Sequence, residues 1–129
     1  MKFVIGGQYS GKLNYTLKLF NLLEEQVASG EESDIDQLIK SPVINNFHLL
    51  IKRLLIEDDN AENVINKINS ILEKNKNVII ISNEIGYGIV PIDKFDRKYR
   101  ELVGRICCNI AREATEVHRV ISGIGEKIK

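Results

Sequence analysis

The sequence has 129 residues, which is the size of one domain and too short for two hydrophobic cores. Eighteen basic residues balance eighteen acidic residues, and this balance argues against a nucleic-acid partner, because proteins that bind the phosphate backbone usually carry a strong basic excess. The longest apolar run, Val78–Ile81, is far shorter than the roughly 20 residues that cross a bilayer, so we expect no membrane partner.

The first residues and the cysteines both favour a cytoplasmic protein. Met1–Gly6 leads directly into a strand pattern, without the apolar stretch and small-residue cleavage site of a signal peptide. Cys107 and Cys108 are neighbours in a helical pattern and point about 100° apart, so they cannot form a disulfide easily. We therefore expect reduced thiols, no metal ligands among the cysteines and a cytoplasmic location.

The N-terminal half of the chain alternates predicted strands and helices. Ser33, three residues before Asp36, resembles the N-terminal cap of a short helix, and Pro42 ends that helix. In chain order, the predicted elements are a strand at 2–5, a helix from 11 to about 25, a strand stub at 27–28, the short helix at 33–39 and a strand at 43–44.

The C-terminal half continues the alternation. The predicted elements are helices at 47–56 and 60–75, a β-branched strand at 78–82, a long helix at 93–114 and a last strand at 117–122. Asp93 is placed to cap the long helix, and Gly123 and Gly125 are expected to break the last strand before a basic tail. The alternation predicts an α/β fold with a single open, mostly parallel sheet and helices on both faces.

A phosphate-binding loop is predicted between the first strand and the first helix. The spacing is a glycine, four residues, a glycine and Lys12; backbone N–H groups and the helix N-terminus can surround a phosphate, and the lysine can reach the outer phosphates. The alternative is an ordinary glycine-rich turn. Residues 1–129 are therefore predicted to form a single P-loop-type nucleotide-binding domain. Its nucleotide-binding residues are Gly6, Gly7, Gln8, Tyr9, Ser10, Gly11, Lys12 and Leu13.

Two features bear on metal and proton chemistry at this loop. Leu13 stands where the motif has a serine or threonine whose hydroxyl binds Mg²⁺, so the expected Mg²⁺ contact is weakened. Glu84 follows the strand at 78–82 in the loop Ser82–Pro91, and it lies near the phosphate loop if the two strands are neighbours. It can then hold Mg²⁺ through water or accept a proton. The alternative is a glycine-rich turn with a solvated glutamate.

Three C-terminal segments carry a resemblance to a known family: Ser82–Pro91, Phe95–Arg105 and Glu116–Lys129. Together with Gly6–Lys12, they resemble the adenosylcobinamide kinase/adenosylcobinamide-phosphate guanylyltransferase family. The resemblance implies a P-loop NTPase-like fold, a role in cobalamin biosynthesis, ATP or GTP as cofactor, adenosylcobinamide as a further partner, and a homo-oligomer. The family phosphorylates the aminopropanol hydroxyl of adenosylcobinamide, then transfers GMP from GTP through a covalent histidine.

The resemblance can be followed position by position. Asn45 stands where the family has an acidic residue, which weakens a second Mg²⁺ contact. The family's guanylylated histidine lies in a region that corresponds here to the acidic segment before Pro42, which contains no histidine. His48 is the candidate substitute carrier, with a structural histidine at a helix start as the alternative. Arg100 and Arg105 are predicted to contact phosphate or substrate; a charged face of an exposed helix is the alternative.

Two functions follow from these patterns. The first is a shortened homologue that binds ATP or GTP and transfers a phosphoryl group to adenosylcobinamide, with Lys12, Glu84 and His48 as the catalytic candidates. The second is a noncatalytic nucleotide- or corrinoid-binding homologue. Leu13, Asn45 and the missing histidine region favour the second.

Overall fold

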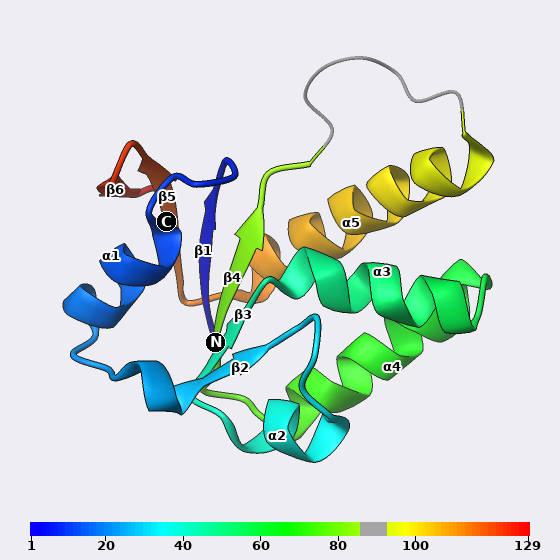
Figure 1. Cartoon of the computed structure of the whole chain (residues 1–129), viewed down its shortest axis with the longest axis horizontal. Coiled ribbons are helices and arrows are strands. Elements are labelled where there is room, and N and C mark those ends of the chain that lie inside the picture. The colour runs from blue at the N-terminus through cyan, green and yellow to red at the C-terminus, as the bar shows by residue number, and fades with distance from the viewer. Residues whose placement is uncertain (86–92) are drawn as a thin grey trace.

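The computed structural model describes residues 1–85 and 93–129, so the predicted loop Ser82–Pro91 lies outside the described residues beyond Ile85. Strands and helices alternate along the chain (Figure 1). In chain order the elements are β1 (Lys2–Gly6), α1 (Lys12–Leu19), the 3-10 turn η1 (Glu24–Gln26), β2 (Val27–Ser29), α2 (Ile35–Lys40), β3 (Val43–Asn45), α3 (Phe47–Glu57), α4 (Ala61–Glu73), β4 (Ile79–Asn83), α5 (Lys94–Glu113), β5 (Glu116–Ile121) and β6 (Ile124–Lys127).

The strands form one open sheet in the order β2-β3-β4-β1-β5-β6. The first five are parallel, and β6 pairs antiparallel with β5. Gly6 at the end of β1 is in register with Asn83 of β4 on one side and with Val120 of β5 on the other. The loop after β1 therefore begins between the carboxyl ends of β4 and β5. Because β1 and β4 are neighbours, Glu84 lies near this loop, as predicted from the sequence.

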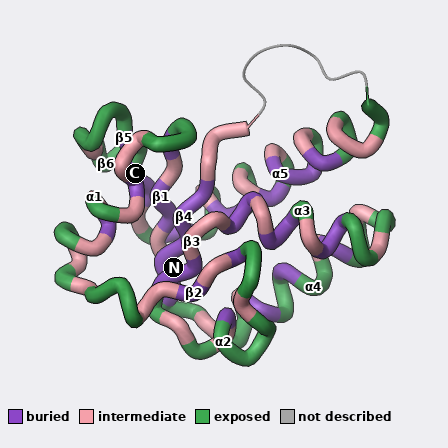
Figure 2. Tube along the Cα trace, in the orientation of Figure 1, coloured by how far each residue is buried: buried purple, intermediate pink, exposed green. Residues whose placement is uncertain are grey.

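Helices cover both faces of the sheet, as predicted, but they do so unequally (Figure 1). Helix α1 packs on one face, where Leu13 and Tyr15 contact a small core around Val4 and Ile81. Helices α2, α3, α4 and α5 lie on the other face over the larger core, which includes Phe3. Figure 2 shows buried positions along α3, α4 and α5, and these residues belong to the larger core. The larger core supports α3, which is the helix that faces the phosphate loop.

Helix α1 is shorter than predicted, and the expected extension to Glu25 is wrong. The helix ends at Leu19 because Asn21 adopts a left-handed conformation, with φ of 53°. The N–H of Leu22 donates to the carbonyl of Leu17 at 2.9 Å, and the N–H of Asn21 donates to Lys18 at 3.4 Å. These two bonds form the Schellman motif, which satisfies the last carbonyls of a helix and ends it.

Two further expectations need correction. Helix α2 is capped by Asp34, not Ser33: the Asp34 carboxylate accepts from the N–H of Gln37 at 2.8 Å in a capping box. The predicted break after β5 is a two-residue hairpin turn instead. Ser122 and Gly123 have φ of 49° and 78°, the combination typical of a type I′ turn, and the chain returns as β6.

None of the helices in the described part of the chain is long and apolar enough to span a membrane.

Candidate phosphate-binding site

The loop between β1 and α1 ends in a left-handed glycine at the start of the helix. Gly11 stands at the N-cap of α1 with φ of 84°, a conformation that favours glycine. The carbonyl of Ser10 accepts from the N–H of Gly123 at 2.7 Å, which fixes the loop against the hairpin after β5. The first turn of α1, beginning at Lys12, leaves N–H groups without intrahelical partners, and these groups attract anions.

Lys12 is folded back onto this loop. Its Nζ donates to the carbonyl oxygen of Gly7 at 2.7 Å, and the residue is only 9% exposed. Burial lowers the pKa of the Lys12 ammonium, while the carboxylate of Glu84 acts in the opposite direction. The side chain is therefore folded into the loop, with its ammonium group held against the Gly7 carbonyl.

A cavity of about 650 Å³ opens beside the loop, a size typical of ligand sites. Three elements contribute to its walls: the loop with the start of α1, the β3–α3 connection, and the end of β4. The lining residues are Gln8, Tyr9, Ser10, Gly11, Lys12, Leu13, Asn14, Asn45, Asn46, His48, Leu49 and Asn83. Most of the predicted nucleotide-binding residues, and also Asn45 and His48, thus face one space. We call this space the loop cavity.

Glu84 lies beside the loop, but its carboxylate is already engaged. The backbone N–H of Glu84 donates to the carbonyl of Gly6 at 2.8 Å, which confirms that the β4 end and the loop meet. Arg119 of β5 donates to both carboxylate oxygens, from Nε at 2.8 Å and from a terminal nitrogen at 3.2 Å. Sequence reasoning missed Arg119 because the two residues are 35 positions apart and meet only through the β4-β1-β5 strand order.

The side chains near the loop do not fit Mg²⁺ well. Leu13 has no oxygen, Asn45 offers an amide in place of a carboxylate, and both Glu84 oxygens are hydrogen-bonded to a guanidinium. Mg²⁺ prefers oxygen ligands that include one or two carboxylates. Within residues 1–85 and 93–129, no group of three His, Cys, Asp or Glu side chains is placed to share a metal ion. The described side chains therefore form a poor ligand set for Mg²⁺.

His48 lies in the first turn of α3 and faces the loop cavity. Its Nδ1 accepts a hydrogen bond from the backbone N–H of Asn83 at 3.2 Å. Its carbonyl oxygen accepts from the Tyr99 hydroxyl at 3.1 Å. Burial, together with the charges of Lys12 and Lys52, lowers the pKa of His48 to about 4, so the ring is neutral at neutral pH.

The two arginines predicted from the resemblance lie away from the loop. Arg100 forms an ion pair with Asp96 one turn earlier on α5, at 3.4 Å. Arg105 pairs with Glu62 of α4 at 3.2 Å. Neither belongs to the residues that line the loop cavity, so the structure does not bring them together with Lys12.

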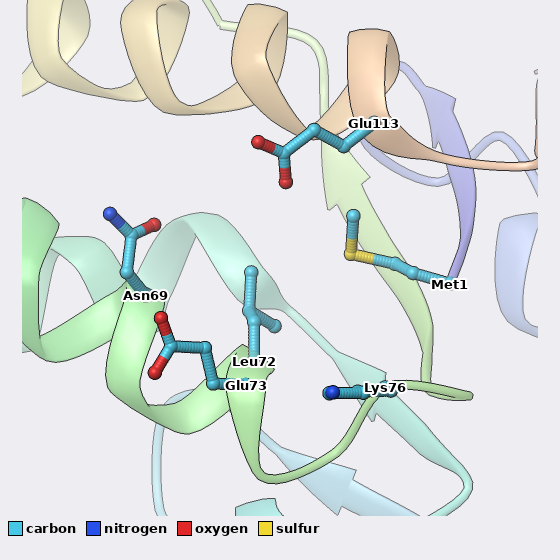
Figure 3. Close-up of a pocket in the computed structure, with 6 residues that line it drawn as sticks. All are labelled: Met1, Asn69, Leu72, Glu73, Lys76 and Glu113. Atoms are coloured by element: carbon cyan, nitrogen blue, oxygen red, sulfur yellow. The ribbon is translucent and has the colours of Figure 1, made fainter.

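A second hollow, of about 400 Å³, lies at the opposite end of the strands from the loop cavity. Met1 and Lys76, which precede β1 and β4, line it with side chains of α4 and with Glu113 at the end of α5 (Figure 3). In parallel α/β sheets ligands bind at the carboxyl ends of the strands, and this hollow is at the amino ends. The loop cavity is therefore the better candidate for a nucleotide.

The fold and the loop define a class: an open-sheet α/β protein, P-loop NTPase-like, with a lysine-bearing loop at the carboxyl edge of the sheet. Residues 21–128 match the family described as "Cobinamide kinase / cobinamide phosphate guanyltransferase", and the chain belongs to this family. The matched segment begins after Gly6–Lys12, so the assignment of that loop rests on its own geometry and spacing.

Two curated relatives share part of this sequence. Both are named "Bifunctional adenosylcobalamin biosynthesis protein CobU", one from Escherichia coli (strain K12) and one from Salmonella typhimurium (strain LT2). Each is 46% identical to this chain over 52 residues, which is 40% of this chain. The match covers 29% of the length of each relative.

Proposed function

We propose that this chain binds ATP or GTP at the loop Gly6–Lys12 and acts in cobalamin biosynthesis. The observation that carries the proposal is Lys12, which folds over a glycine loop at the carboxyl end of β1 and faces a cavity large enough for a nucleotide. Membership in the family and the names of the two relatives support the same pathway.

A polar atom inside the loop adds support. The hydroxyl of Ser10 is buried and has no hydrogen-bond partner among the residues that the structure describes. A buried hydroxyl without a partner costs about 1–3 kcal/mol. A phosphate oxygen that accepts from Ser10 would remove that cost, so the ligand-free loop is left with an unmet donor that suits an anion.

The reaction that fits this proposal is phosphoryl transfer to the adenosylcobinamide hydroxyl. The hydroxyl oxygen forms a bond to the γ-phosphorus, the bond to the β–γ bridging oxygen breaks, and the nucleoside diphosphate leaves. Lys12 and the loop N–H groups stabilise the charge that develops on the phosphoryl oxygens. Glu84 is the acceptor we assign to the hydroxyl proton, after its carboxylate is released from Arg119.

A second candidate function is noncatalytic binding of a nucleotide or a corrinoid. The Arg119–Glu84 pair favours it, because a carboxylate with both oxygens hydrogen-bonded to a guanidinium is already engaged and is a poor metal ligand. Leu13 and Asn45 act in the same direction, since neither supplies a carboxylate or hydroxyl to Mg²⁺.

Product formation separates the two functions. The purified chain is incubated with adenosylcobinamide and ATP or GTP, with and without Mg²⁺, and the corrinoid is analysed by mass spectrometry. The first function predicts a product heavier by one phosphoryl group, and a Lys12→Met variant should not form it. A wild-type chain that binds nucleotide and leaves the corrinoid unchanged would support the noncatalytic function instead.

Substitution of Arg119 tests the engaged carboxylate. In an Arg119→Gln variant Glu84 loses its guanidinium partner, and we expect Mg²⁺ to raise the affinity for ATP or GTP about 3- to 10-fold more than in the wild-type chain. Isothermal titration with and without Mg²⁺ measures the effect. Arg112→Gln, at the exposed end of α5, is the matched control. Equal Mg²⁺ responses in both variants would contradict the role given to the pair.

A further inference from the structure

His48 is fixed in the wall of the loop cavity from two sides. It is the second residue of α3, and it follows Asn46, whose left-handed φ of 53° turns the chain from β3 into the helix. The backbone N–H of Asn83 holds the ring at Nδ1, and the Tyr99 hydroxyl holds the backbone carbonyl. With the ring and the backbone both held, His48 is a rigid part of the cavity.

The bond to Asn83 determines which ring nitrogen carries the proton. A peptide N–H can only donate, so Nδ1 must accept with its lone pair. The ring is neutral at neutral pH because burial and two nearby lysines lower its pKa to about 4. A neutral imidazole has one N–H, and with Nδ1 accepting, that proton is on Nε2.

The Nε2–H group is therefore a hydrogen-bond donor that can accept no proton and needs an acceptor as its partner. In the described part of the chain no group is hydrogen-bonded to Nε2, while the residue as a whole lines the same cavity as Lys12. Among the described residues, Ser10 Oγ is the one buried side-chain oxygen or nitrogen without a partner, so the unpaired Nε2 is not sealed in the core but open to the cavity. An anionic ligand on the phosphate loop, across the cavity from α3, would supply the missing acceptor.

We propose that His48 binds the ligand's phosphate by donating a hydrogen bond from Nε2–H, as a neutral partner to the charged Lys12. The proposal rests on the proposed function, since it requires a phosphate in the loop cavity. It also bears on His48 as a covalent carrier. Attack on phosphorus needs a free nitrogen lone pair, and the only lone pair of this tautomer faces Asn83.

Two substitutions separate the two sides of the ring. In His48→Asn the side-chain oxygen can replace Nδ1 as the acceptor for Asn83, but the donor at the Nε2 position is lost. In His48→Gln an amide N–H can reach the Nε2 position. A hydrogen bond to a charged group contributes about 1.5–3 kcal/mol, so His48→Asn should weaken binding about 10-fold or more. His48→Gln should stay within about threefold of the wild-type affinity.

The probe is inorganic tripolyphosphate without divalent cations, titrated calorimetrically into the full chain. Wild-type binding that His48→Asn leaves unchanged, or that both variants weaken equally, would overturn the role of His48 and leave the proposed function standing. A wild-type chain that does not bind tripolyphosphate would overturn both. Thermal unfolding confirms that each variant is folded.

Nitrogen-15 NMR of the wild-type chain gives a readout that needs no variant to fold. The ring nitrogens of His48 should show a protonated Nε2 and an unprotonated Nδ1 at neutral pH, and tripolyphosphate should shift the Nε2 resonance. The chain has one other histidine, His118, so two sets of ring signals are expected. A proton on Nδ1 of His48 would refute the proposal directly.

Discussion

Replacing Lys12 with methionine is expected to lower the affinity for ATP or GTP about 100-fold. Methionine keeps most of the aliphatic stem that is buried beneath the loop, but it removes the ammonium that donates to Gly7 and would meet the phosphates. A charge-assisted hydrogen bond contributes about 1.5–3 kcal/mol. The loss of two such bonds to the phosphates, each at the low end of that range, accounts for an effect of this size. Isothermal titration of the folded variant measures it.

The control for this change is Lys67→Met, the same substitution at an exposed position on α4. It should leave nucleotide affinity within about twofold of the wild-type value, because a charge exposed on the surface and outside the cavity is largely screened by salt. If Lys12→Met binds nucleotide as tightly as this control, the loop is an ordinary glycine-rich turn.

Replacing Gly6 with alanine is the second large change, and it acts on the fold as well as on the site. A Cβ at Gly6 would lie 2.5 Å from the carbonyl oxygen of Val120 and 2.7 Å from the Ser10 hydroxyl oxygen. The Val120 carbonyl belongs to β5 and cannot move without disturbing its pairing with β1. Overpacking of this kind costs about 1–3 kcal/mol. Urea denaturation should show that loss of unfolding free energy.

Gly7→Ala is the matched control, one residue further along the same loop. A Cβ there would have no heavy atom within 4 Å, so the free energy of unfolding should change by less than about 0.5 kcal/mol. Equal destabilisation by both substitutions would mean that the effect comes from backbone flexibility rather than from the close approach of β5.

The central part of the fold could be predicted from the sequence because β-branched runs and helical spacing are local signals. The strand at 78–82 and the capping of α5 by Asp93 are of this kind, and the Asp93 carboxylate accepts from the N–H of Phe95 at 2.7 Å. The incorrect predictions occur where the backbone conformation of one or two residues determines where an element ends. Asn21 ends α1 through its left-handed conformation, and Ser122 with Gly123 turns the chain into β6 rather than ending the sheet.

The site also has features that could be predicted from the sequence and features that could not. The loop Gly6–Lys12 and its meeting with Glu84 follow from motif spacing and from the rule that ligands bind at the carboxyl ends of parallel strands. The ion pair to Arg119 and the ring orientation of His48 depend on pairings between distant segments. Composition, periodicity and motif spacing do not encode such pairings, so those two features required the three-dimensional structure.

The most direct test of the central claim is a titration of the wild-type chain with ATP and GTP, each with and without Mg²⁺. The loop cavity and its poor set of metal ligands predict that at least one nucleotide binds and that Mg²⁺ changes its affinity by less than about threefold. Absence of binding by either nucleotide would contradict the phosphate site itself. Binding that occurs only with Mg²⁺ would contradict the inference that the side chains near the loop are poor ligands for Mg²⁺.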